Sequence, residues 1–139
     1  MMENTAIRRF STKIRVRYSE TDKMGFCYYG NYAQYFEVAR VEALRELGIV
    51  YKNLEENGIL LPVTDFKISY KQAAKYDDVL EIRTVISKLE GTRITFQYEV
   101  YNEAVVKLNE AETTLVFVDA TSMKPIAVPK FISNLVNHG

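Results

Sequence analysis

The residues that most often carry catalysis are sparse in this chain, which narrows the chemistry it can perform. The only histidine is His138, next to last in the sequence, and the only cysteine is Cys27. A Ser-His-Asp or Cys-His triad needs an imidazole held rigidly beside its nucleophile, whereas chain termini tend to fray. One His and one Cys also cannot supply the ligands of a zinc site, so we expect no metal. An active site here would use carboxylates, hydroxyls and backbone dipoles.

Asp22 is a carboxylate that could take part in such chemistry. It lies in a turn-rich segment, residues 19–25, just before a predicted helix that begins at Asn31. The first N–H groups of a helix have no partner within it and stabilise negative charge. Around Tyr29 and Gly30 they could polarise a substrate carbonyl as an oxyanion hole, and the glycine would let the substrate approach the backbone closely. The plainer alternative is that Asp22 only forms the turn.

Two hydrophobic periods divide the chain into one long helix and several strands. Apolar residues recur with the helical period from Asn31 to Leu47, with Gly48 as a stop signal and Gln34 completing a capping box. A short helix is predicted over residues 51–56. Alternating apolar residues predict strands at 12–18, 64–70, 80–86, 93–100 and 105–118. The antiparallel sheet must cover its apolar face, and the long helix is the only cover this order provides, which predicts an α+β fold.

Length and composition set broad limits on the protein. A chain of 139 residues is the size of one domain, so we expect a single domain over 1–139. Lys+Arg and Asp+Glu both number 18, and this zero net charge argues against nucleic acid as a partner. No stretch approaches the roughly 18 apolar residues of a membrane span, and residues 1–13 lack the apolar core of a signal peptide. A single cysteine fits a reducing compartment, which predicts a cytoplasmic protein.

The segment from Tyr18 to Glu42 resembles the 4-hydroxybenzoyl-CoA thioesterase family of hotdog proteins. That family has an Asp-x-x-Gly motif, then an aromatic-rich loop, then Asn or Ser followed by Tyr where the central helix opens. The matching residues of this chain are Asp22, Gly25, Tyr28, Tyr29, Asn31 and Tyr32. Residues 70–80 and 121–129 resemble later parts of the family more weakly, so that the resemblance covers about residues 12–130.

The resemblance implies a hotdog fold, with a long central helix wrapped by a five-stranded antiparallel β-sheet. It implies hydrolysis of an acyl-CoA thioester to free carboxylic acid and CoA, with no cofactor beyond the CoA of the substrate. It implies a homodimer or homotetramer with sites between subunits. The matched positions give a catalytic set of Asp22, Tyr29 and Gly30 and a substrate-binding set of Gly25, Tyr28, Asn31 and Tyr32. In the family the matching aspartate acts as general base or as nucleophile, and both roles stay open here.

The sequence departs from the family pattern at the start of the helix. Many bacterial relatives have histidine at the position of Tyr29, and the branch that has tyrosine follows it with proline, where this chain has Gly30. The identity of the acyl group is therefore open. Tyr28 and Tyr32 could equally be core aromatics, and Cys27 is better explained as a small loop hydrophobe than as a nucleophile.

Three alternative functions fit parts of the sequence. A hotdog dehydratase would need an internal histidine, which the chain lacks. A non-catalytic acyl-CoA binding or sensing module would gain nothing from a carboxylate that faces a thioester, so Asp22 argues against it. A thioesterase that acts on acyl-carrier-protein thioesters is the nearest variant.

The ten tyrosines are many for this length and favour a subunit interface.

Overall fold

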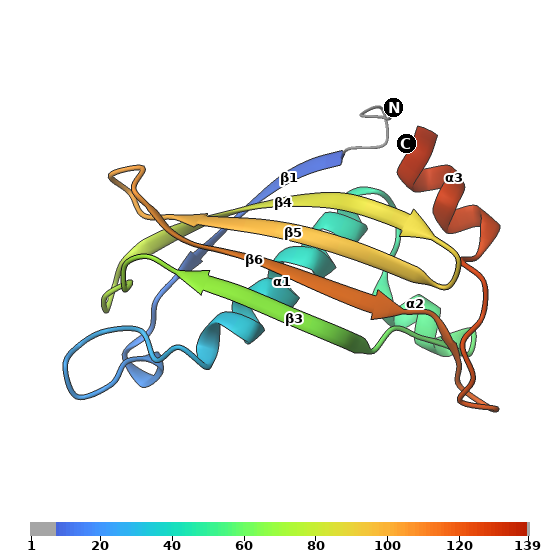
Figure 1. Ribbon diagram of the computed structural model, residues 1–139, viewed down its shortest axis with the longest axis horizontal. Coiled ribbons are helices and arrows are strands. Elements are labelled where there is room, and N and C mark those ends of the chain that lie inside the picture. Colours follow the sequence, from blue (N-terminus) through green and yellow to red (C-terminus); the bar gives the residue numbers. More distant parts are fainter. Residues whose placement is uncertain (1–7, 139) are drawn as a thin grey trace.

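The computed structural model describes residues 8–138, with side chains through residue 137. Five strands make up its main sheet: β1 Arg8–Arg15, β3 Val63–Tyr70, β4 Val79–Glu90, β5 Arg93–Tyr101 and β6 Lys107–Val116. They lie in the spatial order β1-β4-β5-β6-β3, and every neighbouring pair is antiparallel (Figure 1). A smaller sheet pairs β2 Ile59–Leu60 with β7 Val118–Asp119. Residues 1–7, part of the segment 1–13 that was predicted not to be a signal peptide, and the His138 side chain lie outside the described part.

One long helix crosses the inner face of the sheet. The helices are α1 Asn31–Glu46, α2 Tyr51–Glu56 and α3 Lys130–His138. Helix α1 starts beside the end of β3 and runs diagonally towards β4 and β1 (Figure 1). The predicted α+β arrangement, a central helix against a five-stranded antiparallel sheet, is confirmed. Within residues 8–138, no helix is long and apolar enough to cross a membrane.

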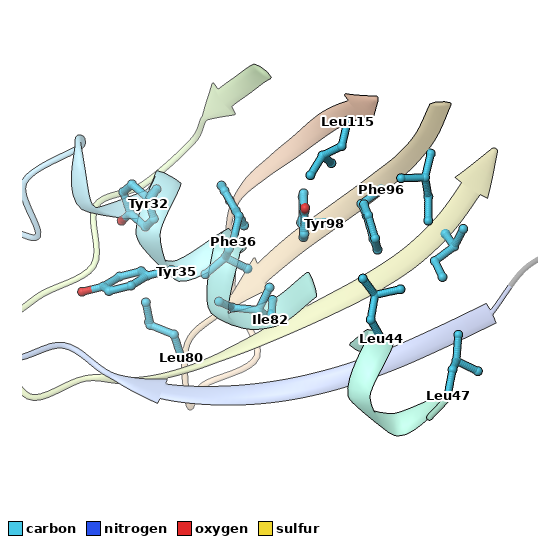
Figure 2. Close-up of a cluster of buried hydrophobic side chains, with 14 of the residues drawn as sticks. Tyr32, Tyr35, Phe36, Leu44, Leu47, Leu80, Ile82, Phe96, Tyr98 and Leu115 are labelled. Carbon is cyan, nitrogen blue, oxygen red and sulfur yellow. The ribbon is translucent and has the colours of Figure 1, made fainter. Parts of the chain in front are cut away.

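The core lies between α1 and the inward face of the sheet. Phe36 of α1 is fully buried and stacks on Tyr98 of β5, with ring centroids 4.5 Å apart. Leu80 and Ile82 of β4 and Leu115 of β6 face the same helix (Figure 2). In β4 and β5 these inward side chains alternate with more exposed ones, because successive side chains of a strand point to opposite faces. The apolar period of the sequence therefore selects which face of the sheet α1 covers.

The first strand differs from its predicted bounds. It spans Arg8–Arg15 in place of residues 12–18. The backbone N–H of Arg17 donates to Oε1 of Glu20 at 2.9 Å, and a short 3₁₀ helix follows the strand there. The side chain of Tyr18 consequently points outward and is 78 % exposed, although the alternation placed it on the apolar face.

The predicted capping box at the start of α1 is also wrong. The residue that precedes the helix is Gly30, and the structure has no side-chain cap there. The side-chain amide of Asn31 instead donates to the backbone carbonyl of Glu20 at 2.7 Å. The other end of the helix follows the prediction, because Gly48 takes a left-handed φ of +91° just beyond it.

The predicted element order missed α3 and merged two strands. Ile132 and Val136 lie four residues apart on α3 and are both buried, so α3 packs one apolar face against the core. This spacing is a helical signal in the sequence. The predicted strand 105–118 is divided, because Phe117 leaves the main ladder and its N–H donates to Thr92. The chain then turns into β7.

Phe36→Ala should lower the free energy of unfolding by about 3–5 kcal/mol, because it leaves a cavity between α1 and the sheet. Phe131→Ala on α3 is the matched control, since the Phe131 ring is half exposed. It should cost less than about 1 kcal/mol. Urea denaturation of both variants measures the difference, and equal losses would show that the contact between α1 and the sheet is not the centre of the core.

Candidate active site

A small hairpin holds Asp22 beside the start of α1. The N–H of Asp22 donates to the carbonyl of Phe26 at 2.8 Å, and the N–H of Tyr28 donates to the carbonyl of Glu20 at 2.8 Å. Gly25 forms the tip with a φ of +83°, a conformation that side chains with a Cβ rarely adopt. Two rungs of backbone hydrogen bonds therefore fix Asp22 relative to the residues that enter the helix.

The Asp22 carboxylate has one occupied oxygen and one free oxygen. Its Oδ1 accepts the N–H groups of Met24 at 2.9 Å and Phe26 at 3.2 Å. Asp22 therefore helps to form its turn, as the plainer alternative in the sequence predicts. Its Oδ2 has no hydrogen-bond partner among the described residues 8–137, and the side chain is exposed. Asp22 can therefore stabilise its loop and still present an oxygen to a ligand.

The backbone at the start of α1 offers two hydrogen-bond donors. The N–H groups of Asn31 and Tyr32 donate to the carbonyls of Tyr28 and Tyr29. In the part of the chain that the structure describes, the N–H groups of Tyr29 and Gly30 donate to no acceptor. A Cβ at Gly30 would lie 2.7 Å from the Tyr28 ring, so glycine lets the ring pack against this turn. Together with the helix dipole, these donors favour a negatively charged or polarised oxygen.

Exposed tyrosines surround this turn. The Tyr28 and Tyr29 rings lie 4.8 Å apart, and the Tyr29 ring lies 6.4 Å from that of Tyr70 on β3. These three residues, which we call the tyrosine surface, are 50 %, 64 % and 48 % exposed. Tyr32 is buried beneath them, 5.9 Å from the Tyr70 ring, and its hydroxyl accepts the N–H of Ala74. The structure thus places Tyr28 at the surface and Tyr32 in the core.

The remaining site predictions divide in a similar way. The side-chain amide of Asn31 donates to the Glu20 carbonyl, and Gly25 has the positive φ of the turn. Cys27 is buried, and burial raises the pKa of its thiol, which agrees with its predicted role as a small hydrophobe. Tyr70 and Glu20 were not among the predicted site residues. Tyr70 lies at the end of a strand whose inner face was predicted to be covered by the long helix. Glu20 lies in the segment 19–25, which was predicted to be a turn.

The site lies on an open surface of the single chain. A groove of about 1050 Å³ runs along the sheet and is lined by polar residues such as Arg9, Arg83, Glu99 and Glu112. Residues 19–32 contribute nothing to its lining. The described residues also contain no group of three or more His, Cys, Asp or Glu side chains arranged to hold a metal ion. The groove and the loop that carries Asp22 are therefore separate parts of the surface.

Comparison with known proteins places this arrangement in a family. A DHNA-CoA thioesterase structure from Staphylococcus aureus superposes with a TM-score of 0.83 at 38 % identity, covering 86 % of this chain and 80 % of that one. This likeness confirms the predicted hotdog fold. The acyl-CoA thioester hydrolase YbgC of Escherichia coli O6:H1 is 36 % identical to this chain, and the acyl-CoA thioesterase YbgC of Haemophilus influenzae is 35 % identical. Each of these alignments covers 93 % of this chain and 95 % of the relative. Residues 16–136 match the family model described as the Thioesterase-like superfamily, and the chain belongs to that family.

Proposed function

We propose that this chain hydrolyses acyl-CoA thioesters to free carboxylic acids and CoA, and that the reaction depends on Asp22. As a member of a thioesterase family the chain is a thioester hydrolase, and its relatives from E. coli and H. influenzae are named for acyl-CoA. One observation supports the choice of residue most strongly. The loop that carries the free Oδ2 of Asp22 is tied by backbone hydrogen bonds to the turn that carries the Tyr29 and Gly30 N–H groups.

These groups suit the two demands of thioester hydrolysis. As an oxygen nucleophile attacks, negative charge develops on the carbonyl oxygen, and the N–H groups of Tyr29 and Gly30 would donate to it. Asp22 either accepts a proton from the attacking water or attacks the carbonyl carbon itself. In the second route a mixed anhydride forms and water then hydrolyses it. Both routes break the carbon–sulfur bond and release the CoA thiol after protonation, and neither requires a histidine.

The tyrosine surface and the turn would bind the acyl end of the substrate. Tyr28, Tyr29 and Tyr70 present ring faces and hydroxyls next to the proposed oxyanion hole. Gly25 has open space where a Cβ would lie, and the absence of a Cβ at Gly30 lets the Tyr28 ring pack against the turn. We propose no cofactor beyond the CoA of the substrate. We place the enzyme in the cytoplasm, because its single cysteine is free and buried.

We further propose that the active form is at least a homodimer built on the β3 edge. Strand β3 lies at the end of the main sheet, and its apolar residues Val63, Phe66 and Tyr70 are all exposed. An edge strand with an uncovered apolar face invites pairing with a second strand. A second copy aligned there would bury these side chains and enclose the surface around Asp22. A homotetramer would add a second interface to this pair.

Asp22→Asn should lower kcat for acyl-CoA hydrolysis at least about 100-fold while the protein stays folded, because asparagine keeps the turn but loses the base or nucleophile. Release of free thiol from short, long, branched and aromatic acyl-CoAs measures the activity. Asp119→Asn is the matched control, since Asp119 also accepts a backbone N–H in a turn, at 2.8 Å from Ser122. Full activity of Asp22→Asn would refute the proposed role. Tight acyl-CoA binding without turnover by the wild type would favour the sensing module.

Phe66→Glu should break the proposed β3 interface, because it places a charge there, so that a dimer becomes a monomer and a tetramer becomes a dimer. Analytical ultracentrifugation reports the mass against the 16.1 kDa of one chain, and circular dichroism checks the fold. Phe131→Glu, at an exposed phenylalanine of α3, is the control and should leave the mass unchanged. A monomeric wild type that hydrolyses acyl-CoA at full rate would refute the dimer proposal.

A further inference from the structure

Glu20 is a buried carboxylate two residues before Asp22, and its role is not explained by the proposed chemistry. It is 7 % exposed, whereas Asp22 is exposed. We propose that Glu20 is a positioning residue, which fastens the start of α1 to the Asp22 loop so that Asp22 and the Tyr29 and Gly30 N–H groups keep their relative positions. This inference rests on the proposed role of Asp22. It adds Glu20, which does not touch the substrate, to the residues on which the proposed reaction depends.

The Glu20 side chain joins the end of β1 to the second turn of α1. Its Oε1 accepts the backbone N–H of Arg17 at 2.9 Å and the hydroxyl of Tyr35 at 2.8 Å. Its Oε2 accepts Nε of Arg17 at 3.2 Å and Nη2 at 2.9 Å. A carboxylate removed from water is tolerated when such donors satisfy it. Four donors from two residues, Arg17 just after β1 and Tyr35 on α1, therefore fix this side chain.

The Glu20 backbone makes a second link to the same helix. Its carbonyl accepts the N–H of Tyr28 at 2.8 Å and the side-chain amide of Asn31 at 2.7 Å. Asn31 and Tyr35 are four residues apart, so they lie on one face of α1 one turn from each other. Two attachment points on one helix face fix both the position and the rotation of its first turn, the turn that Tyr29 and Gly30 precede.

The charges around Glu20 keep it ionised. Burial opposes its negative charge, but the hydrogen bonds from Arg17 and Tyr35 outweigh burial and hold the pKa of Glu20 below its ordinary value of 4.5. Burial raises the pKa of Tyr35, and the neighbouring Cys27 and Glu20 raise it further. The groups that face Glu20 are thus the Arg17 cation after β1 and the neutral Tyr35 hydroxyl of α1, with the Cys27 sulfur 3.6 Å from that hydroxyl.

The link should contribute stability that depends on pH. Because folding lowers the pKa of Glu20, the contribution of Glu20 to the free energy of unfolding is fully present above pH 4.5. It is lost as the pH falls through the lower pKa of the folded state. The urea midpoint of the wild type should therefore exceed that of Glu20→Gln at neutral pH, and the gap should close below pH 4.5. A gap of constant size would show that the ionised carboxylate is not what stabilises this link. Glu42→Gln, in an exposed helix pair with Arg45, is the control and should give a profile parallel to that of the wild type.

The kinetic test compares Glu20→Gln, Tyr35→Phe and the double variant with the wild type. Glu20→Gln should lower kcat about 10- to 100-fold through misplaced groups, while KM stays almost unchanged. Tyr35→Phe should act in the same direction, and the double variant should lose no more than Glu20→Gln alone, because the two residues act as one unit. Glu99→Gln is the control, since Glu99 on β5 also pairs with a cation, Lys107, and accepts a tyrosine hydroxyl.

The thiol of Cys27 gives a readout that does not depend on activity. It is buried against the Tyr35 hydroxyl and is the only thiol of the chain, so its alkylation rate reports opening of the loop. The rate should rise in Glu20→Gln and Tyr35→Phe and stay at the wild-type value in Glu99→Gln. Unchanged kcat in Glu20→Gln beside an inactive Asp22→Asn would overturn this inference and leave the proposed function intact. A fully active Asp22→Asn would instead overturn the role of Asp22 itself.

Discussion

The packing of one diagonal helix into a curved sheet is the constraint on which the rest of this structure depends. Phe36 of α1 contacts Tyr98 in the middle of the sheet and Phe66 on the edge strand, so the helix is fixed near its centre. Helix α1 runs from β3 towards β4 and β1, and its rings at Tyr32 and Phe36 contact Tyr70 and Phe66 of β3, which stay partly exposed at the edge of the sheet. The crossing therefore forms the core and also places the start of the helix beside the open edge.

The proposed site follows from that helix start. A helix brings two unpaired N–H groups and a dipole to its first turn without any catalytic side chain, and the hairpin places a carboxylate next to them. Such a site would rely on electrostatic preorganisation and would need no histidine for the hydrolysis of a thioester. Preorganisation requires rigid supports, and the buried Glu20 has the contacts for that task, since it bonds to the loop, the end of β1 and the helix.

Much of the fold could be predicted from periodicity, and much less of the site. The alternation in β4 and β5 and the helical period of α1 are strong because burial enforces them. Glu20 could not be found this way, since its burial depends on Arg17 and Tyr35, which only the folded chain brings together. Asn31 matched a capping box by spacing, but the helix begins at Asn31 itself, and its side-chain amide donates to the Glu20 carbonyl. The exposure of Tyr70 could not be foreseen either, because it depends on the position of β3 at the edge of the main sheet.

A crystal structure with a ketone analogue of an acyl-CoA, in which a methylene group replaces the thioester sulfur, tests the proposed site most directly. We expect the ketone oxygen to lie about 3 Å from the N–H groups of Tyr29 and Gly30, with the Asp22 carboxylate facing the carbonyl carbon. We also expect a second chain to close over the ligand at the β3 edge. A carbonyl bound away from the start of α1, with Asp22 still turned to solvent, would refute the proposed site.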